Sequence, residues 1–372
     1  MTLSKHMNTY QIISYYARKC RDKLLLLTKF LNFTKNRGKH KKIYSKDLAN
    51  RFVSDYKLPI QMTDEKYFFY YLDLYEKDYQ SRTKYDKLCD LIEKEYNGSP
   101  NKFLDVYYHI RDIIITTVEN SEAYKKFNEM DMNKFSVKNN LNITSNNIYN
   151  ETNVGKVFLS FDLKKANFQA LKYADPEIVL NSNSYQEFIG KFTSLEYVAE
   201  SKYTRQVIFG KLKPKRHIIV EKYIIRKIYD FLKDTCGLPY NCVSMSNDEI
   251  IFDLGEFGKM YIDEIFGAVD KANECEKSIK DSLGFEVNVE MYMLHKVQLS
   301  CDKFKRSCYY YKEYITPNKV DGKLLCVPSN YFPIVYKLFN GLALQEEDYH
   351  FDYEGLDCKY CENFTILTDF KH

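Results

Sequence analysis

Two segments of the chain place carboxylates at the ends of short apolar runs. Val157–Leu163 carries Asp162 near its end, and Ser246–Asp253 holds Asp248 and Glu249 between two β-prone stretches. Buried carboxylates need a compensating cation or dense hydrogen bonding. Oxygen ligands suit Mg²⁺ or Mn²⁺, and two such ions can stabilise the attacking and leaving oxygens of a phosphoryl displacement. The residues therefore predict a two-metal site at Asp162 and Asp248, with Glu249 beside it.

Each acid also has an ordinary structural interpretation. Asp162 could cap a helix that starts at Lys164, and Asp248 with Glu249 could form an exposed turn. The order of the acids along the chain, with basic segments between them, favours the metal-site hypothesis over two unrelated structural roles.

The chain that positions these acids is long enough, at 372 residues, for two domains or for one large domain with extensions. Hydrophobic residues make up 45%, so a packed core is expected. The scarcity of Gly (13) and Pro (8) favours helices over turn-rich β architecture. We divide the chain into a helical basic region (1–130), a linker (131–154), the part that carries the acids (155–299) and a C-terminal extension (300–372).

Hydrophobic periodicity locates the elements around the acids. Helical spacing covers Tyr10–Phe33, Asp64–Asp78, Lys84–Tyr96, Lys102–Asn120, Lys164–Tyr173, Tyr185–Val198, Lys202–Phe209, Lys215–Asp234 and Met260–Leu283. Strand-like runs cover Val157–Leu163, Asn241–Met245, Glu249–Leu254 and Phe285–Met291. From residue 155 the order is strand, helices, hairpin, helix, strand. This order predicts an α+β fold in which helices cover one side of an antiparallel sheet.

Positive charge is unevenly distributed, although the net charge is only +4. The first 60 residues hold 14 Lys and Arg against three Asp, and a second basic cluster follows Lys211. Such density attracts phosphate backbones, although a solvated helix face is the simpler reading. Candidate nucleic-acid contacts are Arg18, Lys19, Lys41, Lys42 and Arg216. Tyr309–Tyr311, close to Lys303, Lys305 and Arg306, could stack on bases or pack in the core.

The ten cysteines come without a signal peptide or an apolar segment of ~20 residues. We expect a soluble, intracellular protein with no membrane association, in the cytoplasm or at a viral replication site. The richness in Lys, Asn, Tyr and Ile is typical of an AT-biased coding sequence, as in a viral or otherwise AT-rich genome. Cys358 and Cys361 form one CxxC pair that, with Cys301, Cys308 or Cys326, could bind zinc, but the absence of a second CxxC makes zinc an unlikely cofactor.

An ordered set of motifs from about 155 to 295 resembles the palm and fingers of family A, or DNA polymerase I-like, polymerases. Phe161–Leu171 looks like motif A, Ala174–Val179 like the segment that follows it, Arg205–Gly210 like the core of motif B, and Asn247–Ile251 like motif C. The helix after motif C and the strand Phe285–Met291 match the closing elements of the family. The resemblance covers a little over a third of the chain.

The resemblance implies roles for individual residues. Asp162 and Asp248 would ligate both metals, and Glu249 would support the site. Arg205 stands where the family usually has a triphosphate-binding Lys, and a guanidinium can bind phosphate oxygens bidentately. Phe209 stands where an aromatic ring packs against the incoming nucleotide, and its alternative is an ordinary core position.

Departures from the family pattern concern nucleotide selection. Asn167 replaces a Glu that helps to exclude the ribose 2′-OH, so the sugar preference is open. Asn247 replaces the usual His, and Lys213 replaces the usual Tyr. Arg205 and Asp248 are only 43 positions apart, which implies reduced fingers, for which Lys211, Lys213 and Arg216 could compensate by holding phosphate or template.

The resemblance implies a right-hand polymerase with an antiparallel palm sheet, reduced fingers and a thumb-like region at 1–130. The expected activity is template-directed, metal-dependent nucleotidyl transfer, as in a DNA-directed DNA polymerase without a proofreading exonuclease. Its partners would be a DNA or RNA template–primer, nucleoside triphosphates and possible processivity proteins. Two alternatives stay open: a single-subunit RNA polymerase or primase-like enzyme, and a non-catalytic nucleic-acid-binding protein on a degenerate palm.

Overall fold

The computed structural model describes residues 43–136, 145, 147–301, 307–315 and 322–368. The α-helices of this part are α2 (Lys46–Tyr56), α3 (Glu65–Leu74), α4 (Glu76–Tyr79), α5 (Ser81–Tyr96), α6 (Pro100–Asn120), α7 (Glu122–Glu129), α8 (Ala166–Ala174), α9 (Tyr185–Gly190), α10 (Glu196–Glu200), α11 (Lys202–Lys211), α12 (Pro214–Asp234), α13 (Ile262–Leu283) and α14 (Phe332–Phe339). The strands are β1 (Lys156–Leu163), β2 (Asn241–Met245), β3 (Glu249–Glu256), β4 (Val287–Cys301), β5 (Ser307–Tyr314), β6 (Gly322–Leu325), β7 (His350–Tyr353), β8 (Leu356–Lys359) and β9 (Phe364–Thr368).

The main sheet has the order β2-β3-β1-β4-β5-β6, and β9 pairs with β4. The pairings of β1 with β3 and β4, and of β2 with β3, are all antiparallel. Helices α8–α12 connect β1 to β2, and α13 connects β3 to β4, so the chain follows a β-α-β-β-α-β path. The expectation of an α+β fold with an antiparallel sheet is confirmed, whereas the polymerase right hand stays a prediction.

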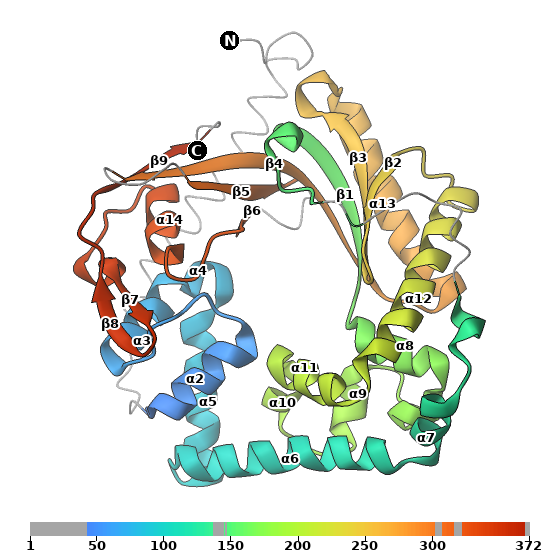
Figure 1. Cartoon of the computed structure of the whole chain (residues 1–372), viewed down its shortest axis with the longest axis horizontal. Coiled ribbons are helices and arrows are strands. Elements are labelled where there is room, and N and C mark those ends of the chain that lie inside the picture. Colours follow the sequence, from blue (N-terminus) through green and yellow to red (C-terminus); the bar gives the residue numbers. More distant parts are fainter. Residues whose placement is uncertain (1–42, 137–144, 146, 302–306, 316–321, 369–372) are drawn as a thin grey trace.

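Strand alternation divides the two faces of this sheet. In β1, Val157, Leu159 and Phe161 belong to the main core, which they share with α12 and α13 residues. Phe158 lies in a separate cluster on the opposite face. Because side chains alternate along a strand, Ser160 and Asp162 share the face of Phe158, away from the covering helices (Figure 1).

Strand β4 is much longer than the sequence predicts. The expected strand ends at Met291, but β4 runs for 15 residues to Cys301, and its second half pairs with β5 and β9. Tyr292, Met293 and Leu294 follow Met291 directly, so four consecutive apolar residues interrupt the expected alternation. The expected division at 299/300 falls inside β4, and the segment 300–372 contributes β5, β6 and β9 to the same sheet.

The C-terminal elements pack against the N-terminal helices (Figure 1). Tyr70 of α3 donates a hydrogen bond to Asp348 Oδ1 at 2.7 Å, and Tyr71 donates to the carbonyl of Glu347 at 2.9 Å. The rings of Tyr75 and Phe332 lie 5.7 Å apart, edge to face. Residues from the two ends of the described chain thus form one structural unit.

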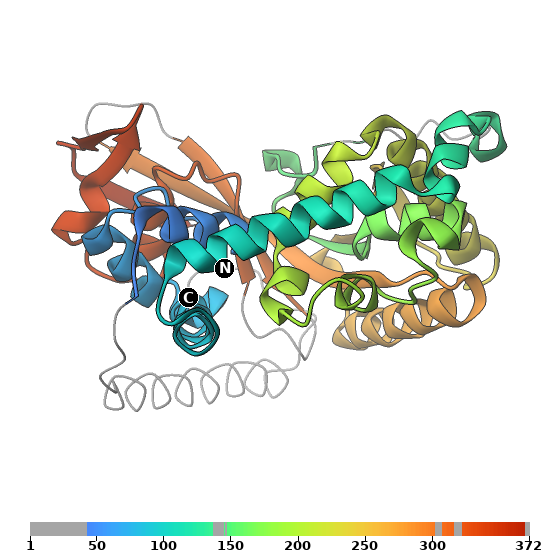
Figure 2. The same cartoon turned by 90° about the horizontal axis from the view of Figure 1, so that it is seen from below.

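Helix α6 runs along the side of the molecule opposite the sheet and joins its two halves (Figure 2). Its 21 residues span about 31 Å at 1.5 Å per residue. Ser99 caps its N-terminus by accepting a hydrogen bond from the Lys102 amide, and Pro100 occupies the first turn, where no intrahelical amide partner is needed. The helix predicted at Lys102–Asn120 is confirmed.

Most other predicted helices are present. The segments predicted at Lys84–Tyr96 and Lys215–Asp234 correspond to α5 and α12, and α13 ends at Leu283 with Gly284, at a φ of 73°, as its C-cap. The single helix expected over Tyr185–Val198 is wrong, because the chain forms α9 and α10 with a break between them. There the Thr193 hydroxyl accepts a hydrogen bond from the Leu195 amide, a local bond that competes with helix continuation.

Two expectations concern segments that the structure describes only in part or not at all. The helix predicted over Tyr10–Phe33 lies outside the described residues. The predicted linker 131–154 contains two short 3-10 turns, Met132–Phe135 and Glu151–Asn153, where it is described. None of the described helices combines the length and the apolar character needed to cross a membrane.

Candidate carboxylate site on the sheet

Three neighbouring strands bring acidic residues to the sheet face that the helices leave uncovered. Asp162 on β1 lies directly opposite Glu249 on β3. The amide of Leu163 donates to the carbonyl of Asp248 at 2.7 Å, so the end of β1 is bonded to the hairpin tip. Glu290 on β4 faces Ser160 of β1 and adds a carboxylate that the sequence did not single out. The register and this hydrogen bond place Asp162 beside the hairpin tip that carries Asp248, and a metal site formed by the two stays a prediction.

The β2–β3 hairpin holds its acidic tip in place through Ser246. The Ser246 hydroxyl accepts from the amides of Asp248 and Glu249 at 3.3 and 3.0 Å, and it donates to Asp248 Oδ1 at 3.0 Å. Beyond the tip, Ile250 and Phe252 are fully buried on the helix-covered face. Alternation therefore directs Glu249 to the opposite face, beside Asp162, while Asp248 is exposed at the tip.

Burial and mutual repulsion both disfavour the charged carboxylates of this cluster. Burial, followed by the charges of Asp248, Glu249 and Glu290, raises the pKa of Asp162 to about 7, and the charge of Lys202 opposes this shift. Burial also raises the pKa of Glu249, although Lys312 lowers it. Ionised carboxylates at these positions consequently favour a bound cation, which would relieve the repulsion.

The nearest cations come from β5 and α11. Lys312 of β5 is buried, lies 3.5 Å from Glu290 Oε2 and sits 4.1 Å from the centre of the Tyr292 ring. On α11, desolvation lowers the pKa values of Lys202 and Arg205, and the charge of Asp162 opposes both shifts. Helix α11 thus presents two cations within electrostatic range of Asp162.

A second pair joins the site from the helical layer. Asn167 Nδ2 of α8 donates to Glu221 Oε1 of α12 at 2.8 Å. Glu221 is only 5% exposed, and burial together with the charge of Asp248 raises its pKa to about 7, against the effect of Asn167. Sequence reasoning missed Glu221, although a signal was present, because it interrupts the apolar stripe of α12 between His217 and Ile224.

The other predicted nucleotide-binding residues are placed differently. Phe209 is 2% exposed and its ring lies 6.1 Å from that of Tyr185, so it occupies the core position that was its alternative. This placement does not support contact with a nucleotide. Lys211 at the end of α11 and Lys213 before α12 are both exposed.

Arg216 bonds to the protein itself, whereas a residue that contacts nucleic acid is expected to face solvent. Its guanidinium donates to the carbonyls of Phe127 at 2.6 Å and Met130 at 2.5 Å, and it lies over the Phe127 ring. It therefore ties the end of α7 to the start of α12. The remaining predicted contacts, Arg18, Lys19, Lys41 and Lys42, lie outside the described residues.

The fit of the acidic side chains to a divalent metal depends on how many ligands they supply. Within the described ranges, no group of three or more His, Cys, Asp or Glu side chains is arranged to hold a metal ion. Mg²⁺, however, is usually bound through one or two carboxylates together with water and substrate phosphates. Asp162 and Asp248 meet that requirement, and the repulsion that raises the pKa of Asp162 is of the kind that a divalent cation relieves. Cys358 and Cys361 are free thiols.

Comparisons with known proteins yield no relative. No family model matches the chain, and neither the curated proteins nor the solved structures include a match.

Proposed function

We propose that this protein is a template-directed nucleic-acid polymerase that joins nucleotides by metal-dependent phosphoryl transfer, with DNA synthesis as its activity. The observation that carries the proposal is the register that sets Asp162 opposite Glu249 and bonds the end of β1 to Asp248. The ordered resemblance to family A motifs adds the substrate class.

In this proposal the acidic residues would bind the metal and the basic residues would bind phosphate. Asp162 and Asp248 would hold Mg²⁺ or Mn²⁺, which in such sites neutralises developing charge on the transferred phosphoryl group. Glu249 would add negative charge beside them. Lys202 and Arg205 interact electrostatically with Asp162, so we expect them to bind triphosphate oxygens beside the metal.

Primer extension with Mg²⁺ and dNTPs tests this proposal directly. We expect Asp162→Asn and Asp248→Asn each to lower the extension rate about 100-fold or more, because each removes a metal ligand. Asp270→Asn, an exposed acid on α13, is the matched control and should extend primers like the parent. Circular dichroism of each variant establishes that the fold is retained.

The same assay separates the alternatives. Synthesis from NTPs on unprimed template would point to an RNA polymerase or primase-like enzyme. Nucleic-acid binding without extension in the parent protein would overturn the proposal in favour of a non-catalytic binding protein. Extension by Asp248→Asn at the parent rate would also overturn it.

A further inference from the structure

A cavity of about 230 Å³ lies where the β5–β6 edge of the sheet meets α4 and α14. It is separate from the carboxylate cluster but borders it, since Tyr314, which lines the cavity, donates a hydrogen bond to Glu290 Oε1 at 3.3 Å. The cavity therefore opens beside the face on which Asp162 and Glu290 lie.

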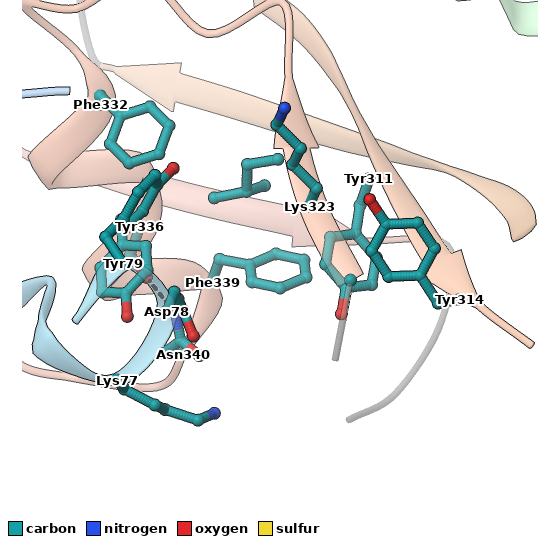
Figure 3. A pocket seen from close by; sticks show the side chains of 12 residues that line it. Lys77, Asp78, Tyr79, Tyr311, Tyr314, Lys323, Phe332, Tyr336, Phe339 and Asn340 are labelled. Carbon is teal, nitrogen blue, oxygen red and sulfur yellow. Dashed lines mark hydrogen bonds between the residues drawn. The ribbon is translucent and has the colours of Figure 1, made fainter. Parts of the chain in front are cut away.

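Aromatic rings form the walls of this cavity (Figure 3). Tyr311 and Tyr314 come from β5 on one side, and Phe332 and Tyr336 come from α14 on the other. Phe339 lies between them, with its ring centre 4.6 Å from that of Tyr311. Flat aromatic walls around a space of this size suit a planar ring such as a nucleobase, because every base offers a π-face for stacking.

The rim of the cavity carries charge suited to a phosphate backbone. Lys77 of α4 and Lys323 of β6 are exposed and lie at opposite ends of the aromatic group (Figure 3). Asp78 also lines the cavity, so an anionic ligand meets two lysines and one carboxylate. Burial and then the charge of Lys323 lower the pKa of Lys202, and the charge of Asp162 raises it, so Lys202 lies within electrostatic range of both residues. Positive charge thus continues from the cavity to the carboxylate site.

Gly322 permits this arrangement at the edge of the sheet. A Cβ atom there would collide with the backbone carbonyl of Lys312 and with the ring of Tyr311. Only glycine allows β6 to approach β5 closely enough to place Lys323 at the rim.

We propose that this cavity holds an unpaired base of a single-stranded nucleic acid, stacked on Tyr311, with neighbouring phosphates at Lys77 and Lys323. The inference rests on the proposed polymerase function, for which it supplies a site that holds the template strand next to the carboxylate cluster. A free nucleotide lacks the neighbouring phosphates that reach both lysines, so an oligonucleotide is the ligand that the geometry favours.

Fluorescence anisotropy with labelled 12-mers tests the pocket in full-length protein without divalent metal. The probes are oligo-dT and an abasic strand of the same length, which keeps the phosphates and lacks the bases. We expect oligo-dT to bind about five-fold or more tightly than the abasic strand, since stacking on an aromatic ring stabilises a bound base. Tyr311→Leu should remove most of that difference, and Tyr79→Leu provides a second aromatic variant of the lining.

Lys323→Gln tests the phosphate contact at an exposed position, where a folding defect is not expected. It should weaken both strands equally and reduce the slope of log affinity against log salt by about 0.7, the value for one phosphate on a single strand. The matched controls are Tyr353→Leu, 59% exposed on β7, and Lys94→Gln, exposed on α5, and both should bind like the parent.

The outcomes separate the pocket from the polymerase. Equal affinity for oligo-dT and the abasic strand, or an unchanged difference in Tyr311→Leu, overturns the pocket even if the protein extends primers. A base-dependent affinity that Tyr311→Leu abolishes supports the pocket, including in a protein that proves unable to extend primers. Asp270→Asn, an exposed acid on α13 outside the aromatic lining, should retain the binding of oligo-dT.

Discussion

Asp162 has opposite effects on the proposed function and on stability: its charged carboxylate would bind metal, but that charge destabilises the fold. Its pKa of about 7, against an ordinary value of 3.8, means that the folded state disfavours the charged carboxylate that metal binding requires. Between these two pH values the folded protein binds more protons than the unfolded chain. Stability therefore falls as the pH rises from about 4 to about 7, and the deficit persists above that range.

Asp162→Asn should therefore stabilise the metal-free protein at high pH. At pH 8.5 we expect a gain in unfolding free energy on the order of 1–2 kcal/mol, which allows for solvent screening of a partly exposed group. At pH 4 the gain should vanish, since the parent carboxyl is then protonated in the folded state. Urea unfolding at the two pH values measures this, with Asp270→Asn as the control. An equal effect at both pH values would contradict the electrostatic account.

At the scale of elements, Asp55 of α2 fastens the helices that carry the cations of the site. This fully buried carboxylate accepts hydrogen bonds from Tyr107 at 2.7 Å, Tyr197 at 2.8 Å and Ser201 at 2.8 Å. The guanidinium of Arg51 lies 3.2 Å away. Helices α2, α6 and α10 and the N-cap of α11 are thus joined at one side chain. The position of Lys202 and Arg205 near Asp162 consequently depends on it.

Asp55→Ala should lower the unfolding free energy by about 3–5 kcal/mol, because it leaves the buried Arg51 charge without its partner. Asp47→Ala, an exposed acid in the first turn of the same helix, removes only a helix-dipole interaction and should change stability by less than about 1 kcal/mol. Chemical denaturation of both variants makes the comparison. Similar losses in the two variants would show that Asp55 does not join the helices.

At the scale of the whole molecule, a buried ion pair closes the C-terminal elements onto the N-terminal helices. Lys337 of α14 lies 2.7 Å from Asp348, and the two side chains are 6% and 0% exposed. Tyr70 donates to the same carboxylate from α3. The wall of the aromatic cavity formed by α14 is held in place by this contact, so the proposed pocket depends on the association of distant parts of the chain.

Asp348→Ala should cost about 3–5 kcal/mol of unfolding free energy, since it leaves the Lys337 ammonium buried without its counter-ion. Combining Asp348→Leu with Lys337→Met should recover most of the loss, because no buried charge remains. Lys66→Ala, which breaks the more exposed pair of Lys66 with Glu347 at the same interface, should cost less than about 1 kcal/mol. Urea denaturation measures all three. A double variant no more stable than Asp348→Ala would refute the electrostatic explanation.

Local signals in the sequence determined much of the fold near the site. The strand that ends at Asp162, the hairpin around Asp248 and the helices α6 and α12 follow from periodicity, caps and turn residues that lie within a few positions of each other. Those signals were enough to predict an α+β fold and to bring the two aspartates together.

Only the tertiary structure decided which other residues belong to the site. Glu290 joins it because β4 pairs beside β1, Glu221 because α12 packs under the hairpin, and the Tyr311 cavity because α14 closes on the sheet edge. Phe209 does not belong to the site, because α11 directs its ring into the core. These placements depend on contacts between segments far apart in the chain, and the local sequence carries no information about such pairings. The sequence by itself thus determined the acids, and long-range packing determined their surroundings.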